Sequence, residues 1–145
     1  MAGAIYLWLT GPFEGPRTYR IPLTVVLLGG VAVHPNEAAE IAARKGEDAL
    51  DIAITEIETL LGHPRMRVVG ETGLDHFRTG PEGREAQERS FRAHIDLAKR
   101  HGLALQIHDR DAHDEVIRVL DEEGAPERTV FHCFSGDAAM ARRCA

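Results

Sequence analysis

The sequence predicts an α/β fold built from repeated strand–helix units, and three observations indicate it. Short apolar runs alternate with amphipathic stretches along most of the 145-residue chain. One long amphipathic stretch stops at Gly102, directly before the next apolar run. Three apolar runs each end near a polar residue able to bind metal: Glu71, His108 and His132. Because parallel strands of a β/α barrel present their carboxyl ends at one shared mouth, we expect these side chains to meet there.

The first predicted elements follow from apolar periodicity and from capping residues. Residues 25–33 form a strand candidate that closes on His34 and a proline. Asn36 is expected to be the N-cap of a helix that runs to Lys45 and stops at Gly46. A second helix presents apolar side chains at helical spacing, namely Leu50, Ile54, Ile57 and Leu61, and ends at Gly62-His63-Pro64.

The later part of the chain repeats this pattern. We expect strands at 67–71, 103–108 and 128–133, a loop at 73–83 with a Gly-Pro turn signal, and helices at 84–101, 112–123 and from Asp137 onward. Four strands, each followed by helix, make about four β/α units. A complete (β/α)8 (TIM) barrel typically needs about 250 residues. The sequence therefore predicts a partial barrel, and we expect the C-terminus to be a truncation.

The first 22 residues differ in character from the rest, since they carry three prolines, three glycines and no clear periodicity. We therefore divide the chain into an atypical N-terminal segment, residues 1–22, and a partial barrel domain, residues 23–145. No apolar run is long enough to span a membrane. Cys133 and Cys144 do not form a disulfide framework, and Cys133 is expected to be a buried core thiol. A cytoplasmic location fits these features.

The charge balance restricts how a nucleic acid could bind. With 23 acidic against 17 basic side chains the net charge is −6, so no bulk attraction to phosphate is expected. A phosphate substrate would need a local site made of metal and a few arginines. The basic residues within 84–101 are interleaved with glutamates, which predicts a solvated helix face and not a nucleic-acid stripe.

Four short segments resemble one known family in order and in spacing. They are Gly-Val-Ala-Val-His-Pro at 30–35, Gly-Glu-Thr-Gly-Leu-Asp at 70–75, Ile-His-Asp-Arg-Asp-Ala at 107–112 and His-Cys-Phe-Ser-Gly at 132–136. The chain from residue 30 to residue 145 looks like the TatD family of metal-dependent deoxyribonucleases. The resemblance implies a TIM barrel that binds divalent ions (Mg²⁺, Mn²⁺ or Zn²⁺) and hydrolyses phosphodiester bonds of DNA, as a DNase or 3′ exonuclease.

The resemblance also implies roles for the three strand-end residues. Glu71, His108 and His132 would be metal ligands, and Glu71 would be catalytic by bridging two ions. A bridging carboxylate sets two ions about 3.5–4 Å apart, where they activate a water and neutralise charge on the leaving oxygen. Two parts of the family pattern are missing from this sequence. One is a His-x-His pair on the first strand, and the other is an Asp at the end of the eighth strand, which would come long after residue 145. The three ligands alone would complete one metal position.

Four further residues each have a functional and a structural interpretation. His34 either lines the pocket or shapes the turn, and Asp75 either supports a ligand or substrate or stabilises a turn. Asp109 could orient a ligating imidazole and Arg110 could grip a phosphate, but either could form an ordinary ion pair. The remaining histidines are expected to be solvated: His63, His76, His94, His101 and His113.

Two alternatives to a DNA-hydrolysing enzyme stay open. The chain could be a truncated, non-catalytic half-barrel that retains part of the metal site. Its two open strand edges would then favour self-association. It could also be a related barrel hydrolase that acts on an amide or a lactone, because the same ligand types serve that chemistry.

Overall fold

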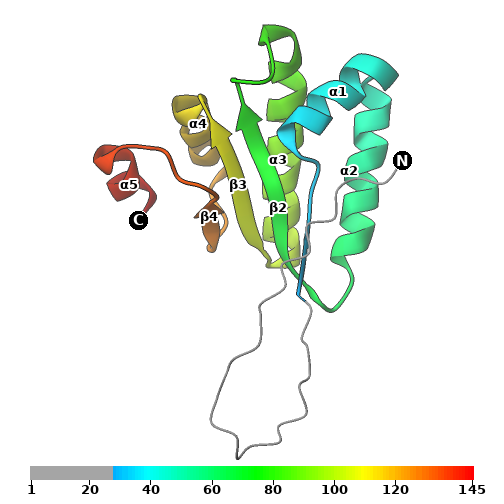
Figure 1. Cartoon of the computed structure of the whole chain (residues 1–145). Helices are drawn as coiled ribbons and strands as arrows, with labels where there is room; N and C mark the ends of the chain where they lie inside the picture. The colour runs from blue at the N-terminus through cyan, green and yellow to red at the C-terminus, as the bar shows by residue number, and fades with distance from the viewer. Residues whose placement is uncertain (1–27) are drawn as a thin grey trace, which may run out of the picture.

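The computed structural model describes residues 28–145, which form one parallel sheet covered by helices (Figure 1). The elements are, in order, β1 (Gly29–Val31), α1 (Pro35–Lys45), α2 (Glu47–Leu61), β2 (Met66–Asp75), the 3₁₀ turn η1 (Pro81–Gly83), α3 (Arg84–His101), β3 (Ala104–Arg110), α4 (His113–Glu123), β4 (Thr129–Phe131) and α5 (Ala138–Cys144). The four strands are parallel in the order β1-β2-β3-β4. This arrangement confirms the predicted α/β fold class and its four β/α units.

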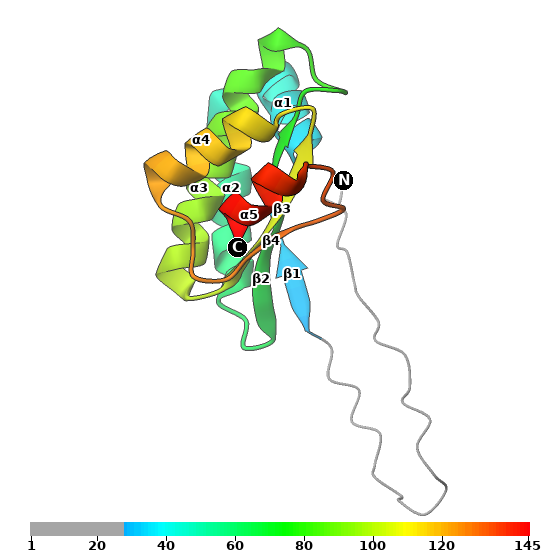
Figure 2. The same cartoon turned by 90° about the vertical axis from the view of Figure 1, so that its left-hand side faces the viewer.

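Helices α2, α3 and α4 pack on one side of the sheet, where the main core lies. In Figure 2, α2, α3 and α4 lie together on one side of the strands. Val69, Leu105 and Ile107 are fully buried, and Phe91 and Ile95 of α3 are fully buried against them. Alternate residues along a strand face opposite sides of the sheet. His108, next to the buried Ile107, therefore faces away from the helices. The register of β2 shifts between Val69 and Thr72, and this irregularity brings Glu71 to the same side, 2.8 Å from His108.

The pairing of β2 with β3 brings their carboxyl ends to one level. Gly73 lies opposite His108 and Asp75 lies opposite Arg110. Gly73 has a φ of 136°, and a Cβ there would lie 2.1 Å from the carbonyl oxygen of His108. Only glycine fits so close an approach between two strands. This contact fixes where β3 presents the His108 side chain relative to β2.

Three local predictions were wrong. The N-cap of α1 is His34 and not Asn36, because the His34 Nδ1 accepts a hydrogen bond from the Asn36 N–H (3.3 Å) and Pro35 occupies the first helical turn. The expected loop at 73–83 begins later, because β2 stays paired with β3 up to Asp75. The first strand is shorter than expected, at Gly29–Val31; part of its predicted range lies outside the described residues.

Two burial predictions were also wrong. Cys133 is exposed and has a φ of 48°, because β4 ends at Phe131 and the chain turns before the thiol could enter the core. His94 is fully buried, because it lies on the inner face of α3 beside Phe91 and Ile95. The other four histidines expected to be solvated are exposed or half-buried. The segment 1–22 lies outside the described residues.

Between residues 28 and 145, no helix combines the length and apolar character that crossing a bilayer requires.

Candidate metal centre

Three side chains from three consecutive β/α units converge at the carboxyl edge of the sheet. They are His34 from the β1–α1 connection, Glu71 from β2 and His108 from β3. One potential ligand atom from each residue lies within 4.8 Å of the other two. All three side chains are half-buried. Two imidazoles and one carboxylate form a donor set that suits Zn²⁺ and related divalent ions, so the residues present fit a metal.

His108 lies between two carboxylates. Its Nδ1 is 2.8 Å from Glu71 Oε1 and its Nε2 is 3.1 Å from Asp75 Oδ2. Burial alone would lower the pKa of His108, but the hydrogen bond and charge of Glu71 and those of Asp75 outweigh it and raise that pKa. The hydrogen bond from His108 lowers the pKa of Glu71, with smaller contributions from His132 and His34. The His108 ring therefore lies beside a Glu71 carboxylate that stays charged.

His34 faces the same centre from the other side. Its ring lies 4.7 Å from the His108 ring, centroid to centroid, at an interplanar angle of 66°. Burial lowers the pKa of His34, and the neighbouring His108 lowers it further. Because its Nδ1 accepts the Asn36 N–H as the helix cap, the ring is held in the turn and its Nε2 is left for the site. His34 thus both shapes the turn and lines the pocket, which were the two predicted alternatives.

Asp75 joins the turn after β2 to the His108 imidazole. Only 1% of this residue is exposed. Its Oδ1 accepts the backbone N–H groups of Phe77 (3.1 Å) and Arg78 (2.8 Å). Its Oδ2 accepts a hydrogen bond from Asn36 Nδ2 at 3.0 Å and contacts His108. Burial acts to raise the pKa of Asp75, but these hydrogen bonds outweigh it and lower that pKa, so the carboxylate stays charged.

Two buried residues of α3 support this arrangement, and the sequence interpretation missed both. Gln87 Oε1 accepts the Asp75 N–H at 3.0 Å, and Gln87 Nε2 donates to Thr79 Oγ1 at 2.8 Å. His94 Nε2 accepts the Val33 N–H at 3.0 Å while its Nδ1 donates to Ser90 O at 2.7 Å. Their seven-residue spacing on the apolar stripe of the helix is the signal that could have identified them.

The remaining predicted site residues lie around this cluster. His132 follows the end of β4 and lies outside the three-donor cluster, although its charge lowers the pKa of Glu71. Its N–H donates to Ile107 O at 2.8 Å, and its Nε2 lies 3.3 Å from Cys133 Sγ. Its role as a ligand stays a prediction.

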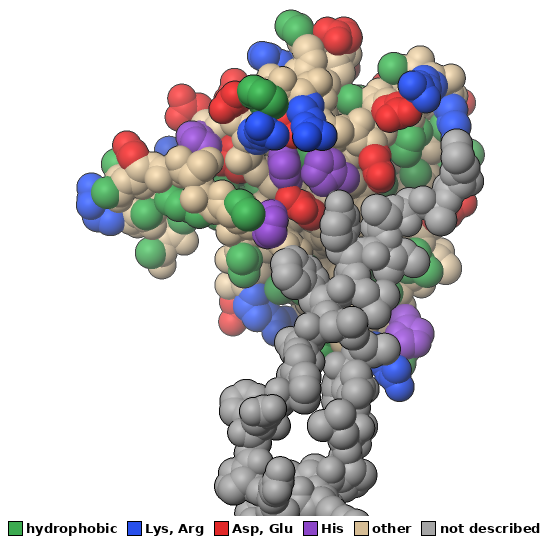
Figure 3. Space-filling model, viewed as in Figure 1, with side chains coloured by type: hydrophobic (Ala, Val, Ile, Leu, Met, Phe, Trp, Pro, Cys, Tyr) green, Lys and Arg blue, Asp and Glu red, His purple; other side chains and the backbone are tan. Residues whose placement is uncertain are grey.

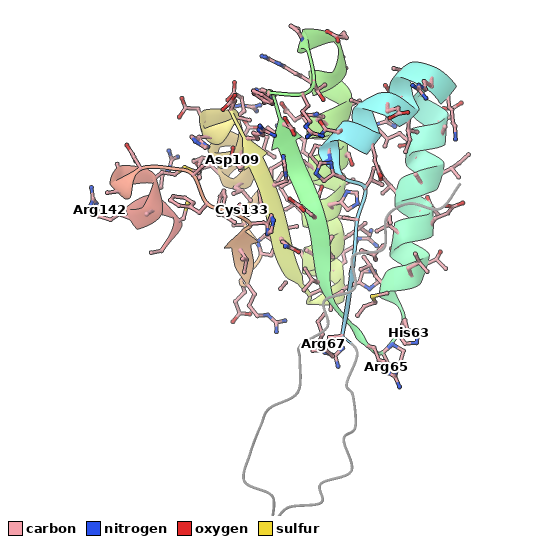
Figure 4. All side chains as sticks on the ribbon, viewed as in Figure 1. His63, Arg65, Arg67, Asp109, Cys133 and Arg142 are labelled. Atoms are coloured by element: carbon pink, nitrogen blue, oxygen red, sulfur yellow. The ribbon has the colours of Figure 1, made fainter. Side chains whose placement is uncertain are left out.

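Asp109 contacts a histidine of α4, which fits the ordinary pair left open for it, and Arg110 contacts an aromatic ring. Asp109 is on the α4 side of β3 (Figure 4), where its Oδ2 lies 2.7 Å from His113 Nδ1, so it pairs with that histidine and not with His108. Arg110 makes no ion pair within the described residues. Its guanidinium carbon instead lies 3.9 Å from the centroid of the Phe77 ring.

A pocket of about 380 Å³ surrounds the cluster. Its lining includes His34, Glu71, Asp75 and His108 together with the basic residues Arg78 and Arg110. Figure 3 shows histidines at the centre of this face with basic side chains directly beside them. A larger hollow of about 570 Å³ between α1 and the start of α3 contains no histidine in its lining. The smaller pocket is therefore the candidate active site.

The comparisons with known proteins agree with this geometry. The family model "TatD related DNase" matches residues 22–145. The metal-dependent hydrolase TatD of Mycobacterium tuberculosis, named as uncharacterized, is 48% identical over 142 residues, which cover 94% of this chain and 47% of that protein. The 3′-5′ ssDNA/RNA exonuclease TatD of Salmonella typhimurium is 31% identical over 114 residues, which cover 77% of this chain and 40% of that protein.

A solved structure shows the same fold. The crystal structure of the TatD homologue YJJV from Escherichia coli superimposes with a TM-score of 0.61 at 23% identity, covering 80% of this chain and 51% of that one. Fold and site together define part of a β/α barrel with a candidate metal centre at the carboxyl ends of its strands. The chain belongs to the TatD-related DNase family, and it spans about half of the length of the relatives that it matches.

Proposed function

We propose that this chain contributes the metal site of a hydrolase that cleaves phosphodiester bonds of DNA. The observation that carries the proposal is the cluster of His34, Glu71 and His108 in a pocket that also contains Arg78 and Arg110. The cluster suits a divalent cation, and the two arginines suit the charge of a phosphate group. A relative that is named a 3′-5′ ssDNA/RNA exonuclease supports the same substrate class.

Each residue has a distinct proposed role. Glu71 and His108 would bind the metal, with His132 as the ligand predicted from the family and His34 as a further donor that the geometry offers. When bound, a divalent ion (Mg²⁺, Mn²⁺ or Zn²⁺) would supply Lewis-acid stabilisation of the phosphate and lower the pKa of water. Asp75 would hold the His108 ring in place through its 3.1 Å contact, which favours one orientation of the imidazole.

A second candidate function is metal binding without catalysis. His132 lies outside the three-donor cluster of the described residues, and the chain spans about half of its relatives' length. For this alternative we also propose that the isolated chain self-associates. The outer edges of β1 and β4 would pair with strands of another copy. We also propose a cytoplasmic location, which the two free cysteines, Cys133 and Cys144, support.

The test is hydrolysis of end-labelled single-stranded DNA by gel-filtered protein with Mg²⁺, Mn²⁺ or Zn²⁺. Glu71→Ala removes the carboxylate at the centre of the cluster, and Glu56→Ala on the exposed face of α2 is the matched control. We expect metal-dependent cleavage that Glu71→Ala abolishes and Glu56→Ala leaves unchanged.

Metal binding by the same proteins, measured by isothermal titration calorimetry, separates the two candidate functions. Binding that is lost in Glu71→Ala, without any cleavage by the wild type, would support the non-catalytic alternative. Cleavage that survives in Glu71→Ala would show that the nuclease activity does not come from this site.

A further inference from the structure

An exposed aromatic ring lies against Arg110, a residue that lines the candidate metal pocket. Phe77 follows the end of β2 and is 62% exposed, the largest exposed fraction among the large apolar side chains of the described residues. The Arg110 guanidinium carbon lies 3.9 Å from the ring centroid. A cation over an aromatic face at this distance is favourable. Phe77 follows β2 by two residues and Arg110 is the last residue of β3; the two are near each other because Asp75 pairs with Arg110 in the sheet.

Hydrogen bonds stabilise the turn that carries the exposed Phe77. The buried Asp75 carboxylate accepts the N–H groups of both Phe77 and Arg78, and the His76 N–H donates to Arg110 O at 2.9 Å. The Asp75 N–H in turn donates to Gln87 Oε1 on α3. These hydrogen bonds fix the backbone of the turn and therefore the point from which the Phe77 side chain extends.

Two cationic side chains of the pocket have no acidic partner among residues 28–145. Arg78 and Arg110 both line the pocket around Glu71 and His108. Neither forms an ion pair with any residue from 28 to 145, whereas Arg89, Arg92 and Arg100 each pair with at least two carboxylates. What sets Arg78 and Arg110 apart is their place: both line the pocket, where their charge, not neutralised by any acidic residue from 28 to 145, suits an anionic ligand.

We propose that Phe77 and Arg110 form a subsite that stacks on one unpaired base of the substrate, and that Arg78 contacts the phosphate next to it. This inference rests on the proposed function for its substrate class. Protein aromatic rings and guanidinium planes stack on the faces of unpaired bases, which paired bases in a duplex keep covered. The subsite therefore makes single-stranded nucleic acid the preferred substrate and makes Phe77 a specificity-determining residue.

The experiment measures binding by fluorescence anisotropy, with EDTA present to prevent hydrolysis. The probes are a fluorescein-labelled oligothymidylate and an oligonucleotide of the same length that has abasic sites throughout, so that the two differ only in their bases. Phe77→Ala removes the ring, Phe77→Trp keeps an aromatic face, and Phe134→Ala is the control at another exposed phenylalanine (43% exposed).

We expect Phe77→Ala to weaken binding of oligothymidylate about 5-fold to 150-fold, the range for one stacked base, and to leave binding of the abasic probe unchanged. Phe77→Trp should restore the wild-type preference, and Phe134→Ala should keep it. Arg78→Met should weaken binding of both probes to a similar extent, because its contact is with phosphate.

The proposal is overturned if Phe77→Ala weakens both probes equally, or if the wild type binds neither probe. Cleavage by the wild type is measured separately with Mg²⁺, Mn²⁺ or Zn²⁺. Base-selective binding without cleavage would leave the subsite in place and reject the proposed hydrolysis. Cleavage by the wild type, together with unchanged probe binding in Phe77→Ala, would support the proposed hydrolysis and reject the subsite.

Discussion

His94 is a buried imidazole that links the helix layer to the connection before the site. It accepts the Val33 N–H, one residue before His34, and donates to Ser90 O within α3. Burial, only partly opposed by the hydrogen bond to Ser90, lowers the pKa of His94 from its usual 6.5 to about 4. The folded protein therefore holds His94 neutral at a pH where the unfolded chain protonates it.

This difference predicts a pH dependence of stability. As the pH falls from 6.5 toward 4, the unfolded state binds a proton that the folded state does not, so the free energy of unfolding decreases by about 3 kcal/mol. Urea unfolding across this range measures the slope. His94→Gln should show a smaller slope than the wild type, and His63→Gln, at an exposed position, should keep the wild-type slope. Equal slopes for the wild type and His94→Gln would contradict this assignment.

Gly73 sets the distance between the two strands that carry Glu71 and His108. A Cβ at Gly73 would lie 2.1 Å from His108 O, and the φ of 136° is itself strained for any other residue. We expect Gly73→Ala to reduce the free energy of unfolding by roughly 3 kcal/mol and to weaken metal binding. Gly46→Ala is the control, since Gly46 also has a positive φ but no atom within 4 Å of an added Cβ. Urea unfolding and calorimetry test both, and similar losses in the two variants would argue against a strand contact.

At the scale of elements, an ion-pair network joins α3 to α4. Arg92 is 29% exposed and contacts Glu88, Glu122 and Glu123. Arg118 on α4 contacts Glu88 and Glu122 in the same network. The solvated outer face predicted for the basic residues of α3 is therefore also a link between helices.

Removal of Arg92 should destabilise the pair of helices. We expect Arg92→Met to lower the free energy of unfolding by about 1 kcal/mol at low salt, and by less at high salt, because the remaining carboxylates repel one another and salt screens them. Arg44→Met is the control, since the Arg44–Glu40 pair is highly exposed (75% and 58% of the side chains). Urea unfolding at two salt concentrations measures the effect; a loss that does not change with salt would mean that packing, and not charge, is responsible.

At the scale of the whole molecule, the sheet has two outer edges. β1 and β4 each pair with one neighbour within the described residues, so one edge of each strand has unpaired backbone groups there. Such edges are templates for association with another strand. Val130 on β4 is 57% exposed, which adds apolar surface at that edge.

We therefore expect concentration-dependent self-association in sedimentation velocity. Val130→Lys should reduce it, because a charged side chain on an edge strand opposes pairing between chains. Ile52→Lys on α2 introduces the same change at a residue that is 61% exposed but away from both edges, and it should leave association unchanged. A single monomeric species at all concentrations would reject association through the edges.

Much of this architecture was predictable because local signals decide it. The helix at 84–101 was predicted with the bounds that the structure shows, since its apolar residues recur at helical spacing and Gly102 ends it in a left-handed conformation. Glu71 and His108 were expected at one edge of the sheet, and parallel pairing brings them to 2.8 Å. Each of these features depends on residues that are near in sequence or on a general rule of parallel sheets.

The sequence by itself determined the alternation of strands and helices, the family and the polar residues at the strand ends. Only the tertiary structure decided which of them meet: His34 joins Glu71 and His108, Asp109 pairs with His113, and His94 enters the core. It also placed Arg110, which lines the pocket, over the Phe77 ring. The reason is physical. Spacing along the chain specifies which face of an element a side chain occupies, whereas its partner depends on how separate elements pack.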